Sequence, residues 1–364
     1  MKVLVISNSS RSIVCSARKA RYEVFALDNF GDIDLLKCAE RTEMLENMTE
    51  KKIYEFAGYC DSVIIGPGFE KLRFKNMLNN KPDIMEKTND KLKISEKFVS
   101  MGIPHPRTSM LEKASGLEFP LMVKPRFGSG GMRNALIKNE EELALFSQEN
   151  NHRDFIAQEF VEGVPCSASL ISTGEDSEIV ALNEQLIGIP WLTRLPFAYC
   201  GNITPFETKF DNEMVNYAKH IAREFKLLGS NGIDFILNGK DLFVIEINPR
   251  FQGSLDTVEL STGINIFDSH VRSFAGELPE PGRPMRFAAK AIVYAKKNIV
   301  ISRDISDRLI RCMDKGKAAD IPQPGRLVRA DEPITTMLGT GKTRRTALEN
   351  VRESSFHTES MTEV

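Results

Sequence analysis

The chain has 364 residues, with 48 Lys and Arg against 50 Asp and Glu and a formal net charge of −2. This near balance excludes a global field that would draw the protein to nucleic acid or to a membrane surface. With 41% hydrophobic and 27% charged residues, a chain of this length predicts two or three globular domains.

Membrane-spanning, secretory and zinc-finger patterns are absent from the sequence. No run of about 18 apolar residues occurs, so no transmembrane helix is predicted, and the N-terminus lacks the apolar core of a signal peptide. The six cysteines show no C-x-x-C spacing. We therefore expect neither a zinc site nor a disulfide framework, but buried free thiols in a reducing cytoplasm.

The N-terminal part alternates strands and helices. A strand at 3–7, a helix at 13–20 and a strand at 22–28 form a predicted β-α-β unit, and a further strand is predicted at 61–68. This order favours a parallel sheet with right-handed crossovers. The loops at 9–11 and 66–68 should face a site, because ligands of open α/β folds bind at the carboxyl edge of the sheet. No G-x-G-x-x-G motif follows the first strand, so a dinucleotide-binding fold is not supported.

A capped helix and a glycine-rich loop come next. Asn89 or Asp90 can cap a helix that ends at Gly102. Residues 119–131, FPLMVKPRFGSGG, predict an apolar strand that delivers Lys124 to a loop. Glycine lets the backbone approach an anion closely, and loop N–H groups can cradle phosphate. The candidate loop residues are Gly128, Ser129, Gly130 and Gly131.

Residues 229–253 predict a β-hairpin with polar side chains on apolar strands. Two apolar runs flank an Asn-Gly turn at 238–241. Side chains alternate along a strand, so Glu246 and Asn248 share a face, and Asp234 of the first run can lie beside them. Two carboxylates and a carboxamide offer the hard oxygen ligands that Mg²⁺ or Mn²⁺ prefers. A merely solvated surface hairpin fits less well with such apolar runs.

Several phrases resemble those of one superfamily, the ATP-grasp ligases, which include D-alanine–D-alanine ligase and biotin carboxylase. The phrases that carry the resemblance are IDF at 233–235, VIEINPR at 244–250, PLMVKP at 120–125 and DK…GIPHP at 90–106. The phrase DIPQPG at 320–325 is similar to an archaeal group of predicted ATP-grasp carboligases.

The resemblance implies an α/β (α+β overall) ATP-grasp fold. It places a parallel α/β domain at 1–86 before an ATP-grasp domain at 87–280, with a lid at about 107–157 and a catalytic core at 158–280. A small β-rich C-terminal module is expected at 285–353, and a disordered tail at 354–364.

The resemblance also implies roles for individual residues. Lys91 and Lys124 contact the ATP phosphates, with Lys87 a weaker candidate than Lys91. Arg250 stabilises the transferred phosphoryl group or, in the simpler alternative, only pairs with Glu246. The segment expected to hold the adenosine consists of Gln158, Glu159, Phe160, Val161 and Glu162.

The sequence departs from the superfamily where the ribose is usually held. Pro165 stands where an acid is usual, and Glu162 could substitute for it.

The Gly/Pro-rich stretch at 187–207 either lines a pocket or forms a packed connection. The phrase GTGKT at 339–343 is not a P-loop, because Thr336 stands where the motif needs glycine.

Together these features imply ATP-dependent ligation of a small carboxylate to an amine. The expected cofactors are ATP with Mg²⁺ or Mn²⁺, and the expected intermediate is an acyl phosphate. Two alternatives stay open: a carboxylase that forms carboxyphosphate, and a nucleotide-binding regulator without chemistry. We expect small-molecule partners, a cytoplasmic location and neither nucleic acid nor membrane; a homodimer is considered because many members of the superfamily are dimers.

Overall fold

The computed structural model describes residues 1–128, 130–131 and 133–362. Its N-terminal part is a parallel sheet in the order β3-β2-β1-β4, covered by helices on both faces. Its elements are β1 (Lys2–Ile6), α1 (Arg11–Lys19), β2 (Glu23–Asp28), α2 (Ile33–Cys38), β3 (Arg41–Met44), η1 (Leu45–Asn47), α3 (Glu50–Ala57) and β4 (Ser62–Ile65). Val3 and Val5 pack on the α1 side, while Leu4 and Ile6 pack on the α3 side. Burial on both faces explains the continuous apolar run of β1.

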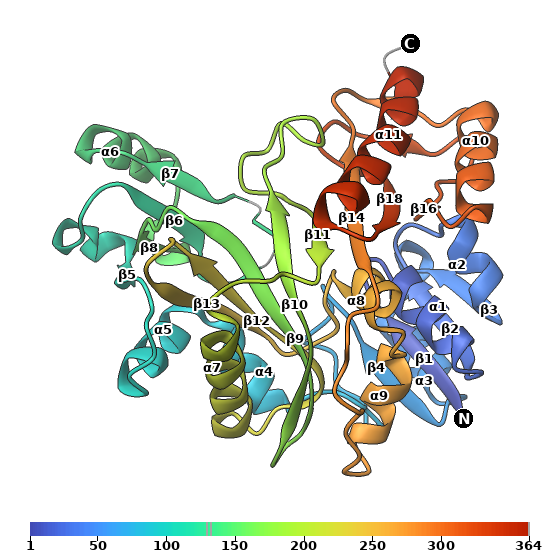
Figure 1. The fold of residues 1–364 in the computed structure, drawn as a ribbon, viewed down its shortest axis with the longest axis horizontal. Helices are drawn as coiled ribbons and strands as arrows, with labels where there is room; N and C mark the ends of the chain where they lie inside the picture. The colour runs from blue at the N-terminus through green and yellow to red at the C-terminus, as the bar shows by residue number, and fades with distance from the viewer. Residues whose placement is uncertain (129, 132, 363–364) are drawn as a thin grey trace.

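A smaller sheet lies on the side of the molecule away from the N-terminal part (Figure 1). Its strands β5 (Thr108–Met110), β6 (Leu121–Pro125), β7 (Ala135–Ile137) and β8 (Phe155–Glu159) are antiparallel, in the order β5-β8-β6-β7. This sheet has a hydrophobic core of its own. It is accompanied by α4 (Pro82–Asn89), α5 (Lys91–Ser100), η2 (Leu111–Gly116), α6 (Glu140–Glu149) and η3 (His152–Asp154).

An eight-stranded antiparallel sheet forms the centre, in the order β13-β12-β9-β10-β11-β14-β18-β16. Its strands are β9 (Val164–Thr173), β10 (Ser177–Ile187), β11 (Tyr199–Thr204), β12 (Leu228–Leu237), β13 (Leu242–Asn248), β14 (Phe287–Tyr294), β16 (Ala318–Ala319) and β18 (Pro333–Gly341). Helix α7 (Asp211–Glu224) packs on one face, and α8 (Leu255–Thr262) and α9 (Ile266–Ser273) pack on the other.

The C-terminal strands extend the central sheet. Strand β14 pairs with β11, and β18 pairs with β14, so the region predicted as a separate small module shares its sheet with the core. Helices α10 (Arg303–Asp314) and α11 (Arg344–Thr362) and the short pair β15 (Ile299–Val300) and β17 (Leu327–Val328) complete it. Helix α11 continues to Thr362, into the stretch that was predicted as a disordered tail.

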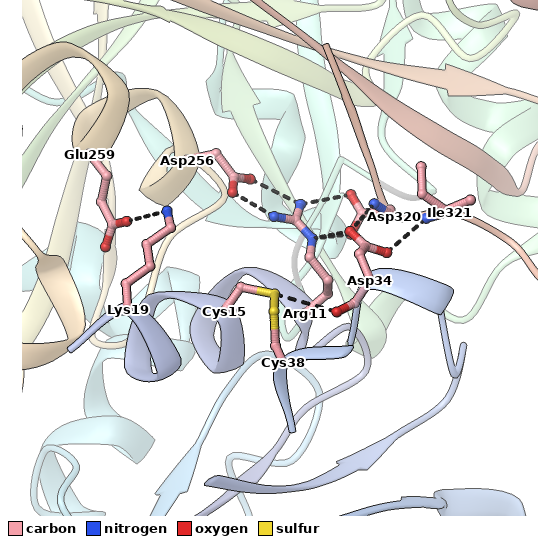
Figure 2. The surroundings of a disulfide bond; sticks show 9 residues. All are labelled: Arg11, Cys15, Lys19, Asp34, Cys38, Asp256, Glu259, Asp320 and Ile321. Carbon is pink, nitrogen blue, oxygen red and sulfur yellow. Dashed lines mark hydrogen bonds and ion pairs between the residues drawn. A yellow bond between two sulfur atoms is a disulfide. The ribbon is translucent and has the colours of Figure 1, made fainter. Parts of the chain in front are cut away.

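Two cysteines are bonded, contrary to expectation. Cys15 on α1 and Cys38 at the end of α2 form a disulfide with a Cα–Cα distance of 5.1 Å (Figure 2). The prediction of free thiols is therefore wrong for this pair, because the crossover brings together two cysteines that are 23 residues apart. The other four cysteines are free, and three of them are buried.

Within the described ranges, no helix combines the length and apolar character needed to cross a membrane.

Candidate active site

The hairpin β12–β13 brings the three predicted metal ligands together. Asp234 lies opposite Glu246 in the register of the two strands. Asn248 Nδ2 donates to Asp234 Oδ2 at 2.8 Å, and Gln185 Nε2 of β10 donates to Asp234 Oδ1 at 3.0 Å. At the turn, the Asn238 side chain accepts hydrogen bonds from the backbone amides of residues 240 and 241, which fixes the register.

The two carboxylates repel each other in a buried setting. Burial, and then the charge of Glu246, raise the pKa of Asp234 to about 7, while the Asn248 side chain opposes the shift. A divalent cation between these oxygens would remove this repulsion, and carboxylate and carboxamide oxygens suit Mg²⁺. The residues therefore fit the predicted metal. Among the residues with described placement, no group of three or more His, Cys, Asp or Glu is arranged as a metal site, because the third oxygen donor here is an amide.

Both predicted lysines lie on the elements that frame the glycine loop. Lys91 begins α5, and its Nζ donates to the Gly128 carbonyl at 2.5 Å. Helix α5 is held in place because its cap residue Asp90 accepts two hydrogen bonds from Arg126, at 2.8 and 2.7 Å. Burial lowers the pKa of Lys124 to about 8, with a further lowering by Lys91, while the two hairpin carboxylates oppose the shift. Lys124 is thus within electrostatic reach of both Lys91 and the hairpin.

The glycine loop needs its glycines. Gly128, Gly130 and Gly131 have φ angles of 121°, 76° and 73°, which favour glycine strongly. A Cβ on Gly131 would lie 1.9 Å from the Phe197 carbonyl oxygen, so the loop packs directly on the 187–207 stretch. Ser129, also predicted to contact phosphate, lies outside the described residues.

Gln158 has a role that the sequence did not reveal. Its Oε1 accepts a hydrogen bond from Lys124 Nζ at 2.7 Å, and its Nε2 donates to Thr108 Oγ1 at 2.9 Å. Gln158 Nε2 also lies 3.2 Å from His105 Nε2, while His105 Nδ1 lies 2.7 Å from the Val244 carbonyl. Burial lowers the pKa of His105 to about 4, so the ring is neutral. A chain of contacts therefore runs from β13 to Lys124; the only sequence signal was His105 in the GIPHP phrase.

Arg250 is buried at the end of β13 and faces the N-terminal part. Its Nη1 donates to Asn248 Oδ1 at 2.8 Å, and its Nε lies 3.4 Å from Glu70 Oε1. The simpler expectation of a pair with Glu246 is wrong, because the nearest carboxylate is that of Glu70. Arg250 Nε is buried and makes no hydrogen bond with the described residues. An anion at this position could satisfy it.

Comparisons with known proteins agree with this geometry. Residues 88–254 match the ATP-grasp domain family. This stretch is therefore similar to an ATP-grasp domain. An uncharacterized protein of Methanocaldococcus jannaschii is 26% identical over 93% of this chain and 88% of its own length. The arginine-specific carbamoyl phosphate synthase large chain of Halalkalibacterium halodurans is 22% identical over 62% of this chain, which spans only 23% of that relative.

Solved structures share the fold of the whole chain. An ADP complex of N5-carboxyaminoimidazole ribonucleotide synthetase superposes with a TM-score of 0.78 at 15% identity, covering 100% of this chain and 98% of that one. The biotin carboxylase domain of Hydrogenobacter thermophilus 2-oxoglutarate carboxylase, with MgADP and bicarbonate, gives 0.74 at 16% identity and covers 97% and 88%. The ATP-grasp fold is therefore confirmed, together with the parallel N-terminal sheet predicted before it.

The predicted adenosine segment of the ATP-grasp domain is only partly available to a ligand. The amide of Glu159 donates to the Arg107 carbonyl, and that of Phe160 donates to the Pro120 carbonyl, at 2.9 and 3.0 Å. In the described part of the chain the amide of Val161 has no such partner. Glu162 is exposed. The structure thus leaves Val161 as the amide of this segment that could meet an adenine edge.

A cavity of about 270 Å³ adjoins the ATP-grasp domain. Its walls come from three parts of the chain: loops of the N-terminal sheet, the segment 251–253 that follows Arg250, and the C-terminal strands β14 and β18. Tyr199 on β11 lines it, and both Asp234 and Asp256 contribute to raising the Tyr199 pKa, after burial. The cavity therefore lies close to the hairpin site. The loops after β1 and β4 line it through Ser9 and Pro67.

Proposed function

We propose that this chain is an ATP-dependent ligase that joins a small carboxylate to an amine and releases ADP and phosphate. The observation that carries the proposal is the convergence of opposite charges within electrostatic reach of one another. Two lysines, one buried arginine whose Nε makes no hydrogen bond with the described residues, and two facing carboxylates come from separate segments of the ATP-grasp domain. Phosphoryl transfer needs this kind of positioning and charge neutralisation more than it needs a covalent group.

Each residue has a defined task in this proposal. Lys91, Lys124 and the amides of the glycine loop hold the phosphates of ATP, and Gln158 orients Lys124. Asp234, Glu246 and Asn248 hold Mg²⁺ or Mn²⁺, which supplies charge neutralisation at the phosphate oxygens when bound. Arg250 stabilises the charge of the phosphoryl group in transfer through its guanidinium.

The proposed reaction has two steps. A substrate carboxylate oxygen attacks the γ-phosphorus, the bond from that phosphorus to the ADP oxygen breaks, and an acyl phosphate forms. The amine nitrogen then attacks the acyl carbon, phosphate leaves with the C–O bond electrons, and the nitrogen loses one proton. Closure of the sheet β5-β8-β6-β7 over the phosphates, as a lid, would exclude water from the acyl phosphate.

One alternative is favoured by a specific similarity. The 2-oxoglutarate carboxylase domain that shares this fold was solved with bicarbonate. In that alternative the carboxylate in the first step is bicarbonate, and the product of that step is carboxyphosphate. A regulator that only binds nucleotide is less well supported, because it would not need Arg250 and both hairpin carboxylates. A homodimer and a cytoplasmic location remain predictions.

The test is ADP formation with Mg²⁺ and ATP, in the presence of pooled small amines and carboxylates, with mass spectrometry of the products. A product lighter by one water than the sum of two substrates would establish ligation. ADP formation that requires bicarbonate would establish the carboxylase alternative. Tight nucleotide binding without turnover on any mixture would contradict both and favour the regulator.

A further inference from the structure

The cavity beside the ATP-grasp domain has an apolar body and one charged end. Its apolar wall is formed by residues from α1, the segment after Arg250 and the C-terminal strands, namely Ile13, Phe251, Ile292 and Ile334. The charged end contains Asp32 and Arg326, and Asp320 and Lys290 also line the cavity. At about 30 Å³ per water, its volume has room for a molecule on the order of ten non-hydrogen atoms. An apolar pocket with a few polar groups is the usual form of a small-molecule site.

Asp32 is held by a preformed loop at the carboxyl end of β2. Asp28 Oδ1 accepts hydrogen bonds from the amides of Phe30 and Gly31 at 2.6 and 2.7 Å, and Asp28 Oδ2 accepts one from the Ser10 amide at 2.6 Å. Gly31 has a φ angle of 62°, so the turn is tight. The loop that carries Asp32 is therefore held in place by its own hydrogen bonds.

Asp32 is buried but weakly paired. It is 4% exposed, and among the described residues its side chain makes one hydrogen bond, from Arg326 Nη1 at 3.3 Å. The Arg326 guanidinium also lies over the Phe30 ring, 4.5 Å from its centroid. Buried carboxylates are usually paired and hydrogen-bonded more fully than this.

The nearby cations are already engaged by other acids. Arg11 donates to Asp256 and Asp320 and lies 3.5 Å from Asp34, and Lys290 donates to Asp256 at 3.0 Å (Figure 2 shows the Arg11 cluster). The charged groups with the largest electrostatic effect on Asp32 are three acids and one base, namely Asp320, Asp34, Asp28 and Arg326. Burial, then Asp320 and Asp34, raise the pKa of Asp32 to about 8 against the effect of Arg326. Together with the cluster of Arg11, this end of the cavity holds five acids, Asp28, Asp32, Asp34, Asp256 and Asp320, against three bases, Arg11, Lys290 and Arg326, so positive charge is in deficit there.

We infer that Asp32 is a specificity-determining residue that binds a basic amino group on the substrate occupying this cavity. The substrate class is a compact amine with a largely apolar body: the ammonium group supplies the missing charge at Asp32, and the body packs on the apolar wall. The inference rests on the proposed function for its account of why a substrate sits here. It adds the identity of the recognising group and the class of molecule recognised.

Binding of simple probes without ATP tests the inference. The probes are 2-phenylethylamine and hexylamine, their alcohol counterparts, and phenylacetate and hexanoate as anionic counterparts, each followed by ligand-observed NMR and by melting temperature. We expect the wild type to bind the amines and not the alcohols or carboxylates. Asp32→Asn should weaken amine binding by ten- to a hundredfold, as expected for loss of a charge-assisted hydrogen bond.

Three further variants test whether the effect on amine binding is specific to Asp32. Glu259→Gln is the matched control, because Glu259 is a carboxylate with 8% side-chain exposure that does not line the cavity, and it should leave amine binding unchanged. Arg326→Gln should not weaken amine binding, because it removes a competing cation. Ile292→Phe narrows the cavity without changing its charge and should weaken 2-phenylethylamine binding even if Asp32→Asn does not fold.

Each contrary outcome has a clear meaning. No amine binding to the wild type at millimolar concentration, or equal binding to wild type and Asp32→Asn, would overturn the inference. Carboxylate binding that Arg326→Gln abolishes would overturn it in favour of an anion, and loss of amine binding in both Asp32→Asn and Arg326→Gln would overturn it in favour of a zwitterion. Because these assays contain no ATP, they can fail while ADP formation succeeds, and the reverse.

Discussion

At the scale of single residues, the carboxylates of Asp234 and Glu246 repel each other where the metal is predicted to bind. Asp234 and Glu246 face each other across the hairpin, and burial together with Glu246 raises the pKa of Asp234. Glu246 itself makes no hydrogen bond to another described side chain. Its charge is therefore costly to the protein without metal and useful only when a cation is present.

Glu246→Gln should separate these two effects. We expect Mg²⁺-dependent ADP formation to fall by about a hundredfold or more, which is typical for loss of one group that stabilises a charged transition state. The melting temperature of the metal-free protein should rise, because the repulsion with Asp234 is removed. Asp241→Asn, on the exposed turn of the same hairpin, is the control and should change neither. A clear fall in melting temperature would show instead that Glu246 stabilises the fold.

At the scale of elements, the disulfide ties α1 to α2 beside the cavity. The two helices carry Arg11 and Asp34, which meet in the cluster of Figure 2. Linking residues 23 apart restricts the unfolded chain and stabilises the folded one by about 3 kcal/mol in the chain-entropy description. The Cys15→Ser, Cys38→Ser double variant should lose about this free energy of unfolding in denaturant titrations, and Cys312→Ser should lose little. Alkylation of all six cysteines in denaturant without reductant would contradict the bond.

A buried histidine joins α9 to β12 and to the N-terminal part. His270 Nδ1 accepts from the Ser230 amide at 2.8 Å, and its Nε2 lies 2.9 Å from the Leu78 carbonyl. Because Nδ1 accepts a hydrogen bond, the ring must be neutral with its proton on Nε2. Burial lowers the pKa of His270 from 6.5 to about 4.

The buried neutral ring of His270 makes the folded protein less stable toward acid pH. Between pH 6.5 and 4 the unfolded chain binds a proton at this residue that the folded chain does not, so the folded protein loses stability as the pH falls through this window. The full effect of His270 is about 3 kcal/mol. His270→Gln should show a shallower loss between pH 6.5 and 4 than the wild type in chemical unfolding, whereas His220→Gln, on α7, should keep the wild-type slope. Equal slopes in all three proteins would refute this account.

At the scale of the whole molecule, local sequence patterns predicted single elements. They did not predict the contacts between residues that are far apart in the sequence. The alternation of Asp234, Glu246 and Asn248 on two strands was readable, because a hairpin register depends only on nearby residues. The Arg11 and Asp320 contact, 309 residues apart, had no local signature. The same holds for β14 pairing with β11, which made the C-terminal region part of the central sheet. Asp32 was missed because a single acid after a strand has no motif.

Arg11 connects three regions of the molecule that are far apart in the sequence. From α1 its guanidinium donates to Asp256 of α8 and to Asp320 near the C-terminal strands, so three regions meet at one charge (Figure 2). Its side chain is 6% exposed. Burial opposes the charged form, but the two carboxylates outweigh this and raise the Arg11 pKa above its ordinary value. Removing such a cation leaves buried acids without compensation.

Arg11→Met should therefore destabilise the protein by about 3–5 kcal/mol at neutral pH. The loss should shrink as the pH falls, since Asp256 and Asp320, deprived of their partner, would take up protons more readily and lose their charge. Arg18→Met is the matched control on the same helix; Arg18 pairs with Glu40 at the surface, with 54% of its side chain exposed, and should cost at most about 1 kcal/mol. Chemical unfolding of both variants at pH 5 and pH 8 measures this. If Arg11→Met and Arg18→Met lost the same free energy, or if the Arg11→Met loss grew toward acid pH, the three regions would not be held together by this charge.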